Sequence, residues 1–116
     1  MVIRRCDMER EEKVHMRDGE GSAHLIHMVD GSTQKNARLF AEITVNPGCS
    51  IGYHKHEGET EYFFILSGTG IVNDDGKEVQ VKQGDSIITG NGASHGIKNT
   101  GAVPLVFHAI IITYQQ

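Results

Sequence analysis

The sequence is poor in cysteine and proline, and it has no excess of basic residues. Its 116 residues include two cysteines and two prolines, and 15 Asp and Glu outnumber 11 Lys and Arg, for a formal net charge of −4. Without a basic excess the chain has little to displace counterions from phosphates, so we expect no nucleic-acid partner. The longest apolar stretch, Phe107–Thr113, is far shorter than the roughly 20 residues of a spanning helix, so we expect no membrane association.

The two cysteines, Cys6 and Cys49, lie far apart and form no CxxC pair. Two cysteines are too few for a disulfide framework. The first residues lack the pattern of a basic start, an apolar run and a small-residue cleavage site, so we expect no secretory leader, and the sequence contains no N-x-S/T acceptor. We therefore expect two reduced, mostly buried thiols in a cytoplasmic protein.

Glycine, in contrast to proline, is abundant, with 14 residues that mostly punctuate short apolar runs. From Ser22 onward such runs are interrupted by Gly, Asn or Asp at short intervals, which is typical of all-β proteins. With no crossover helix between them, the strands should pair antiparallel in a sandwich or barrel. Strands are expected at Ala23–Val29, Arg38–Val45, Ile51–His56, Glu61–Leu66, Gly70–Asn73, Lys77–Val81, Ser86–Thr89, His95–Lys98 and Leu105–Thr113.

The beginning of the chain has a different composition. Met8–Arg17 mixes both charge signs without a persistent i,i+4 ladder, and we expect a solvated arm there rather than a short helix or turn. The length suits one domain, which we divide into an N-terminal arm, residues 1–35, and a β-barrel, residues 36–116. Because small barrels are marginal alone and Leu25–Val29 is apolar enough to add a strand to a neighbour, we expect a homodimer with possible strand exchange.

Three of the seven histidines share a pattern with one glutamate. His54 and His56 are two apart on an expected strand, so their side chains project to the same face. Glu61 begins the next strand after a turn-prone segment, and His95 begins a later strand after a glycine-rich loop. Three imidazole nitrogens and one carboxylate oxygen on rigid strands suit a divalent first-row transition metal.

The spacing around these residues resembles the two motifs of the cupin superfamily. The chain reads Gly48-x5-His54-x-His56-x4-Glu61-x6-Gly68 and then Gly84-x5-Gly90-x-Gly92-x2-His95-x3-Asn99. The resemblance implies an antiparallel double-stranded β-helix, or jelly-roll barrel, with a metal inside. It also implies the ligands His54, His56, Glu61 and His95. One departure is Gly90, where the family has a proline, which affects the rigidity of the loop and not the ligand set.

The resemblance implies one divalent transition metal per chain (Mn, Fe, Ni or Zn) and a small-molecule ligand. We expect a metal-dependent enzyme acting on an oxygen-rich organic ligand, a carboxylate, keto acid or enediol, of decarboxylase, dioxygenase or isomerase type. The acidic stretch Glu57–Glu59 after the histidine pair resembles small bacterial cupins called oxalate-decarboxylase-like. The alternatives are a non-catalytic small-molecule-binding or sensing module and, less in keeping with one short chain, a storage cupin. No catalytic base can be assigned from the sequence.

Five further residues carry narrower expectations. His108 lies in an apolar strand and, if it faces inward, could orient a metal ligand or contact substrate. Tyr53 could place its hydroxyl at the barrel mouth. Asn99 is expected to cap a turn rather than bind metal. His24 and His27, three apart on a strand, should face opposite sides.

Overall fold

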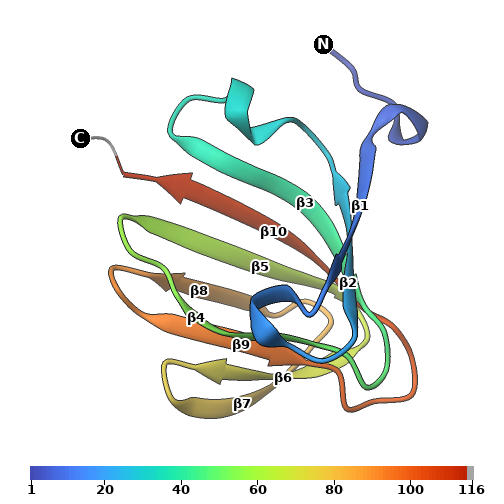
Figure 1. Ribbon diagram of the computed structural model, residues 1–116, viewed down its shortest axis with the longest axis vertical. Coiled ribbons are helices and arrows are strands. Elements are labelled where there is room, and N and C mark those ends of the chain that lie inside the picture. The colour runs from blue at the N-terminus through green and yellow to red at the C-terminus, as the bar shows by residue number, and fades with distance from the viewer. Residues whose placement is uncertain (115–116) are drawn as a thin grey trace.

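Ten strands form two antiparallel sheets in the computed structural model, which describes residues 1–114 (Figure 1). The six-stranded sheet has the order β1-β2-β3-β10-β5-β8, and the four-stranded sheet has the order β4-β9-β6-β7. Three single turns of 3-10 helix lie in the N-terminal part: η1 (Arg5–Asp7) before the first strand, and η2 (Met16–Asp18) and η3 (Gly31–Thr33) between strands. The strands are β1 (Glu9–Val14), β2 (Ser22–His27), β3 (Ala37–Val45), β4 (Ser50–Lys55), β5 (Glu59–Ser67), β6 (Thr69–Asp74), β7 (Lys77–Lys82), β8 (Ser86–Gly90), β9 (Ser94–Lys98) and β10 (Leu105–Thr113).

Alternation along the strands explains why the two sheets pack face to face. In β10 the side chains of Phe107, Ala109 and Ile111 are buried between the sheets, while His108 and Ile110 point to the other face. The same period of two in the other strands buries one continuous apolar core, with Phe63 and Phe107 in ring contact at its centre. This is the all-β jelly-roll architecture expected from the sequence.

The expected turns are also present. The hairpin between β6 and β7 closes through Asp75 and Gly76, whose φ values are 51° and 99°, with Asp74 opposite Lys77. Two consecutive positive φ angles define the tight hairpin turn whose twist matches the flanking strands. Asn99 is buried and its side-chain oxygen accepts the backbone N–H of Gly101, as expected of a residue that caps a turn.

All nine expected strands are found, but the prediction that Met8–Arg17 forms a solvated arm is wrong. Residues 9–14 form β1, which pairs antiparallel with β2 from Glu9 opposite His27 to Val14 opposite Ser22. The strand was missed because it carries charges where an inner strand would carry apolar residues. It lies at the edge of the sheet, where charged side chains stay solvated and discourage pairing with other chains.

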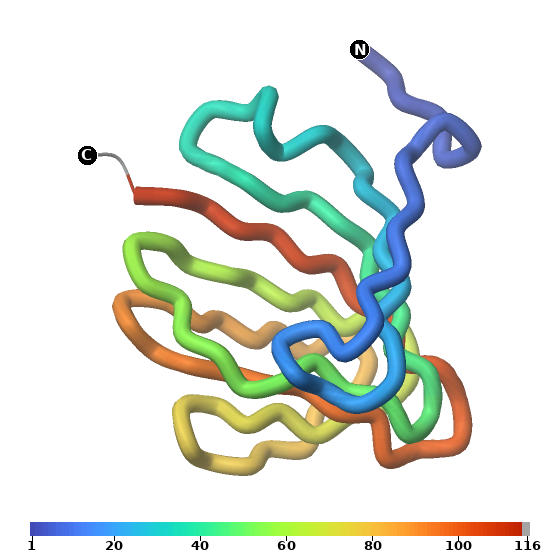
Figure 2. The backbone as a smooth tube through the Cα atoms, in the orientation of Figure 1, coloured from blue at the N-terminus to red at the C-terminus, as the bar shows by residue number. Residues whose placement is uncertain are grey.

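The loop after β1 reaches across to the other sheet. Ser50 of β4 donates its N–H to the Glu20 carbonyl at 2.9 Å, and its hydroxyl lies 2.8 Å from the Glu20 nitrogen. A Cβ atom at Gly52 would overlap the carbonyl of Arg17, and one at Gly19 would overlap the carbonyl of Ser50. Because both positions are glycine, the η2 loop lies directly on β4, and the tube view shows this crossing (Figure 2).

Two further expectations concern the cysteines and strand exchange. Both cysteines are free. Cys6 is exposed in η1, so the prediction that it is buried is wrong, whereas Cys49 is half-buried against the core.

Strand β2 pairs with β1 and β3 of its own chain, so both its edges are used within the chain. Among residues 1–114, no helix has the length and apolar character needed to cross a membrane.

Candidate metal centre

Four side chains from both sheets meet at one end of the space between them. His54 lies in β4, paired with His95 of β9, and His56 follows the end of β4. Glu61 comes from β5 in the other sheet. A register shift between Ile51 and His54 interrupts the β4–β9 ladder, an irregularity of the kind that re-aims side chains beside functional sites.

The four side chains converge through specific atoms. Nε2 of His56 lies 3.0 Å from Nε2 of His54, 3.1 Å from Nε2 of His95 and 3.0 Å from Oε1 of Glu61. The same Glu61 oxygen lies 2.8 Å from Nε2 of His95. Two ligand atoms at right angles, each about 2.1 Å from one ion, are about 3.0 Å apart. The spacing therefore fits a single metal ion, and this cluster could hold one.

The outer nitrogen of each imidazole has its own partner. Nδ1 of His54 lies 2.6 Å from the Gly52 carbonyl, and Nδ1 of His56 lies 2.5 Å from Oε2 of Glu59. Both oxygens only accept hydrogen bonds, so these two Nδ1 atoms carry protons and their Nε2 lone pairs face the cluster. Nδ1 of His95 lies 2.9 Å from the Thr89 hydroxyl. Lone pairs directed at one another repel unless a cation or proton lies between them, so the donor set fits a metal.

Burial and neighbouring charges shift the pKa values in the cluster. Burial lowers the pKa of His54 to about 4, against a smaller opposing effect of its bond to Gly52. Burial alone would raise the pKa of Glu61, but its close contacts with the His56 and His95 rings outweigh burial and lower the value to about 2. Burial opposes a charged His56, yet its contacts with Glu61 and Glu59 leave its pKa raised. At neutral pH, His54 and Glu61 are therefore in the forms that bind metal.

Sequence reasoning missed the pair that supports His56. Arg38 of β3 donates from Nε and Nη2 to the two oxygens of Glu59, at 2.7 and 2.8 Å. This two-point contact orients the Glu59 carboxylate toward His56. In the sequence, Glu59 could be suspected from its position three residues after His56, within the acidic stretch. Arg38 lies 21 residues before Glu59, and no sequence pattern connects it to the site.

His108 and Tyr53, which were predicted to contact a metal ligand or the substrate, do not lie at the cluster. His108 points to the outer face of the six-stranded sheet, level with Glu42 and Phe64. Tyr53 is 51% exposed on the outer face of the four-stranded sheet. Neither lines the cavity at the cluster, so neither placement supports a contact with metal or substrate there. His24 is exposed and His27 points to the opposite side, where it meets Glu11, as expected.

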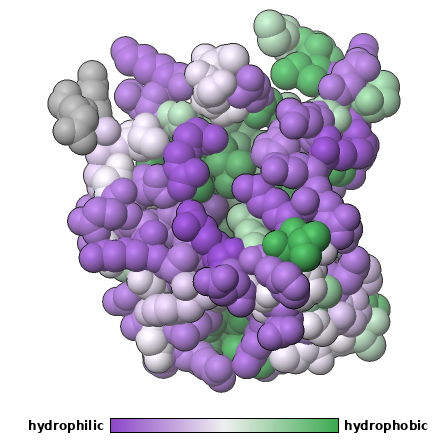
Figure 3. Space-filling model, in the orientation of Figure 1, coloured by the Kyte–Doolittle hydropathy of each residue, from purple (hydrophilic) through white to green (hydrophobic). Residues whose placement is uncertain are grey.

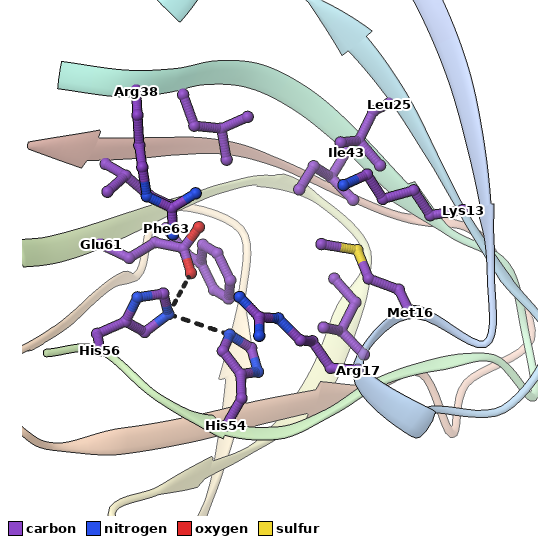
Figure 4. A pocket seen from close by; sticks show the side chains of 13 residues that line it. Lys13, Met16, Arg17, Leu25, Arg38, Ile43, His54, His56, Glu61 and Phe63 are labelled. Atoms are coloured by element: carbon purple, nitrogen blue, oxygen red, sulfur yellow. Dashed lines mark hydrogen bonds and ion pairs between the residues drawn. The ribbon is translucent and has the colours of Figure 1, made fainter.

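A cavity of about 260 Å³ opens from the cluster (Figure 4). Glu61 and the histidines lie at one end, where Phe63 stacks on His95 at 4.7 Å between ring centroids, and Leu25, Ile43 and Met16 line the other end. The space-filling view shows apolar surface within a hollow whose surroundings are mostly hydrophilic (Figure 3). The volume is below that of pockets for drug-sized ligands and suits a smaller molecule. The lining residues are Lys13, Met16, Arg17, Leu25, Arg38, Leu39, Ile43, Ile51, His54, His56, Glu61, Phe63 and Ile111.

Comparison with known proteins gives consistent matches along the whole chain. A family model described as a cupin domain matches residues 41–111. An oxalate-binding protein of Thermotoga maritima is 44% identical over 113 residues, which cover 97% of this chain and 93% of the relative. A crystal structure from Thermotoga maritima, described as a predicted oxalate decarboxylase, has a TM-score of 0.91 at 43% identity and covers 97% of this chain and 99% of that one. A polyketide cyclase from Streptomyces resistomycificus, at 17% identity and a TM-score of 0.73, covers 99% of this chain and 80% of its own and shows the fold alone.

Proposed function

The chain belongs to the cupin family, and on this premise we propose that it binds one divalent transition metal through His54, His56, Glu61 and His95 and holds a small carboxylate on that ion. The observation that carries the proposal is the set of four ligand atoms within 4.8 Å of one another, with four of their separations between 2.8 and 3.1 Å. The nitrogen-rich donor set favours Mn, Fe, Ni or Zn over magnesium or calcium.

The ligand class is argued from the cavity and from one relative. The cavity is small and carries cationic side chains beside the cluster, which suits a compact anion. The relative that is 44% identical over nearly its whole length is an oxalate-binding protein. Oxalate is therefore the first ligand to test. A bound ion would supply Lewis acidity and a template for the carboxylate.

Binding of a carboxylate does not require that the protein also converts it, so catalysis is considered separately. The only carboxylate lining the cavity is Glu61, which is one of the four proposed ligands. The cavity lining thus offers no second carboxylate for proton transfer, which favours a binding module. A decarboxylase, dioxygenase or isomerase acting on the same ligand stays a prediction, tested by incubating the metal-loaded protein with oxalate, keto acids and diols with and without dioxygen.

The decisive experiment combines metal content and calorimetry. We expect protein purified without chelator to contain about one transition metal ion per chain and to bind oxalate saturably. His56→Ala should lose metal and oxalate together while staying folded, because the barrel core is apolar. His24→Ala, an exposed histidine on β2, is the matched control and should behave as wild type. Wild-type protein that takes up none of these metals, or that loads metal but binds no carboxylate, would refute the proposal.

We also propose a homodimer and a cytoplasmic location. The two free cysteines suit a reducing compartment.

Because both edges of β2 are paired within the chain, we propose the outer face of β5, β8 and β10 as the dimer contact. That face presents adjacent apolar side chains in register across the three strands, and they are Tyr62, Phe64, Ile88 and Ile110.

A further inference from the structure

Two cations from the N-terminal segment point into the cavity beside the metal cluster. Lys13 comes from β1 and Arg17 from the η2 loop, and both line the cavity with His54 and Glu61. Figure 4 shows the Arg17 guanidinium directed toward the cluster and the Lys13 amine extending into the space opposite. They meet the cluster only because the hairpin made by β1 and β2 folds over the cavity.

Neither cation forms an ion pair with another side chain, although Glu11, two residues before Lys13 on β1, is close enough for Lys13 to help lower its pKa. Among residues 1–114, every ion pair involves other residues, and Arg38, the third cation of the lining, is held by Glu59. Glu61 is the single carboxylate that faces them in the lining. The cavity thus holds one negative charge against two free positive charges before any metal is added. A divalent metal ion increases the positive excess further, so a dianion offsets more of the charge than a monoanion does.

The backbone holds Arg17 in this position at a conformational cost. His15, Arg17 and Asp18 have φ values of 52°, 54° and 64°, a region that non-glycine residues seldom adopt. The loop is closed by hydrogen bonds from His15 N–H to Gly21 and from Asp18 N–H to His15. Such a backbone persists only where its surroundings fix it, and it is concentrated at ligand-binding sites. Its effect here is to turn the Arg17 side chain inward, although most of the loop faces solvent.

We propose that Lys13 and Arg17 form the anion-recognition side of the site and select a small dicarboxylate dianion over a monoanion. Both cations line the same cavity as the cluster, so they can meet the oxygens of a bound ligand that do not contact the metal. Arg17 offers a planar set of donors that matches a carboxylate, and Lys13 adds a single charge. This inference rests on the proposed function, since it assumes that a carboxylate is held at the metal.

The test compares a dianion with a monoanion of similar size. Oxalate and glycolate are titrated by calorimetry at neutral pH into protein loaded with Mn²⁺. Arg17→Gln should weaken oxalate binding roughly tenfold or more, as expected for loss of a charge-assisted contact. Glycolate binding should change by less than about threefold, and the affinity for Mn²⁺ should not fall, because the Arg17 charge can only repel the ion. Lys13→Gln should act in the same direction with a smaller effect.

The control is Arg4→Gln, which removes the same charge from an exposed arginine away from the cavity. It should leave both ligands unaffected. Oxalate binding by wild type should also weaken with added salt more steeply than binding by Arg17→Gln. Equal loss of oxalate and glycolate in Arg17→Gln, or oxalate binding equal to that of Arg4→Gln, would overturn the inference.

The outcomes separate the two proposals. If wild type binds oxalate in a metal-dependent way and Arg17→Gln matches wild type, the proposed function stands and the selection by Arg17 is wrong. If loaded wild type binds neither oxalate nor glycolate, the proposed function fails and the inference fails with it. Arg17 is exposed, so Arg17→Gln should fold normally, which circular dichroism checks.

Discussion

Glu59 decides which nitrogen of His56 faces the metal cluster. Its carboxylate holds the Nδ1 proton and is itself held by Arg38. Glu59→Gln keeps an acceptor oxygen but loses the charge, so we expect metal affinity to fall about tenfold, at the lower end of effects from such supporting contacts. Competition with a chelator measures it. The control Glu57→Gln removes an exposed neighbouring carboxylate; equal affinities in the two variants would show that Glu59 does not orient His56.

Protons should compete with the metal chiefly at His56. The pKa of His56 is raised by Glu61 and Glu59, whereas those of His54 and Glu61 are lowered to about 4 and about 2. At a pH above the pKa of His56, this side chain binds the metal without losing a proton. At a pH below that pKa, each metal ion that binds must displace one proton from His56. Metal affinity should therefore fall by about tenfold per pH unit as the pH drops below that pKa. Metal titrations at several pH values test this, and an affinity unchanged between about pH 8 and about pH 5 would contradict it.

At the residue level, the sequence predicted the cluster but not what surrounds it. His54, His56, Glu61 and His95 could be grouped because strand alternation and motif spacing are local properties. The supporting contact of Arg38 with Glu59 joins residues 21 apart and depends on how β3 packs beside the cavity. His108 shows the same limit, because an apolar strand does not reveal which face of the sheet meets the cavity.

Among the elements, the η2 loop depends on two glycines for its position. A methyl group at Gly52 would overlap the Arg17 carbonyl, a backbone atom that moves only with the whole loop. Gly52→Ala should lower the free energy of unfolding by roughly 2 kcal/mol, the scale of overpacking effects. Thermal unfolding measures this. Gly101→Ala is the control, since its Cβ would meet its nearest atoms at 3.3 and 3.4 Å; equal losses in both variants would show that the contact of η2 with β4 is unimportant.

Strand β1 shows why one element escaped prediction. Its sequence, EREEKV, has no apolar side to bury and reads as solvated chain. It becomes a strand because β2 presents an unpaired edge along its full length. The nine other strands carry alternating apolar residues or glycine-marked turns of their own, so they could be located without knowing their neighbours.

For the whole molecule, the outer face of β5, β8 and β10 predicts self-association. Ile88 is 64% exposed on the edge strand β8, opposite Tyr62, whose ring stacks on that of Phe64. Light scattering at micromolar concentration should give twice the mass of one chain. Ile88→Lys should shift the protein to monomer, because a dimer contact would bury the added charge. Val79→Lys, on exposed β7 of the other sheet, should stay dimeric; a monomeric wild type would refute the dimer.

The hairpin of β1 and β2 gives the binding site two parts that are separate along the chain. The metal cluster lies within residues 41–111, the segment matched by the family model, whereas Lys13 and Arg17 precede it. The contacts that fix the η2 loop on β4 are mostly made by backbone atoms and glycines. Transplanting residues 9–21 from a relative should therefore retune which anion is accepted while the ion-holding framework remains unchanged.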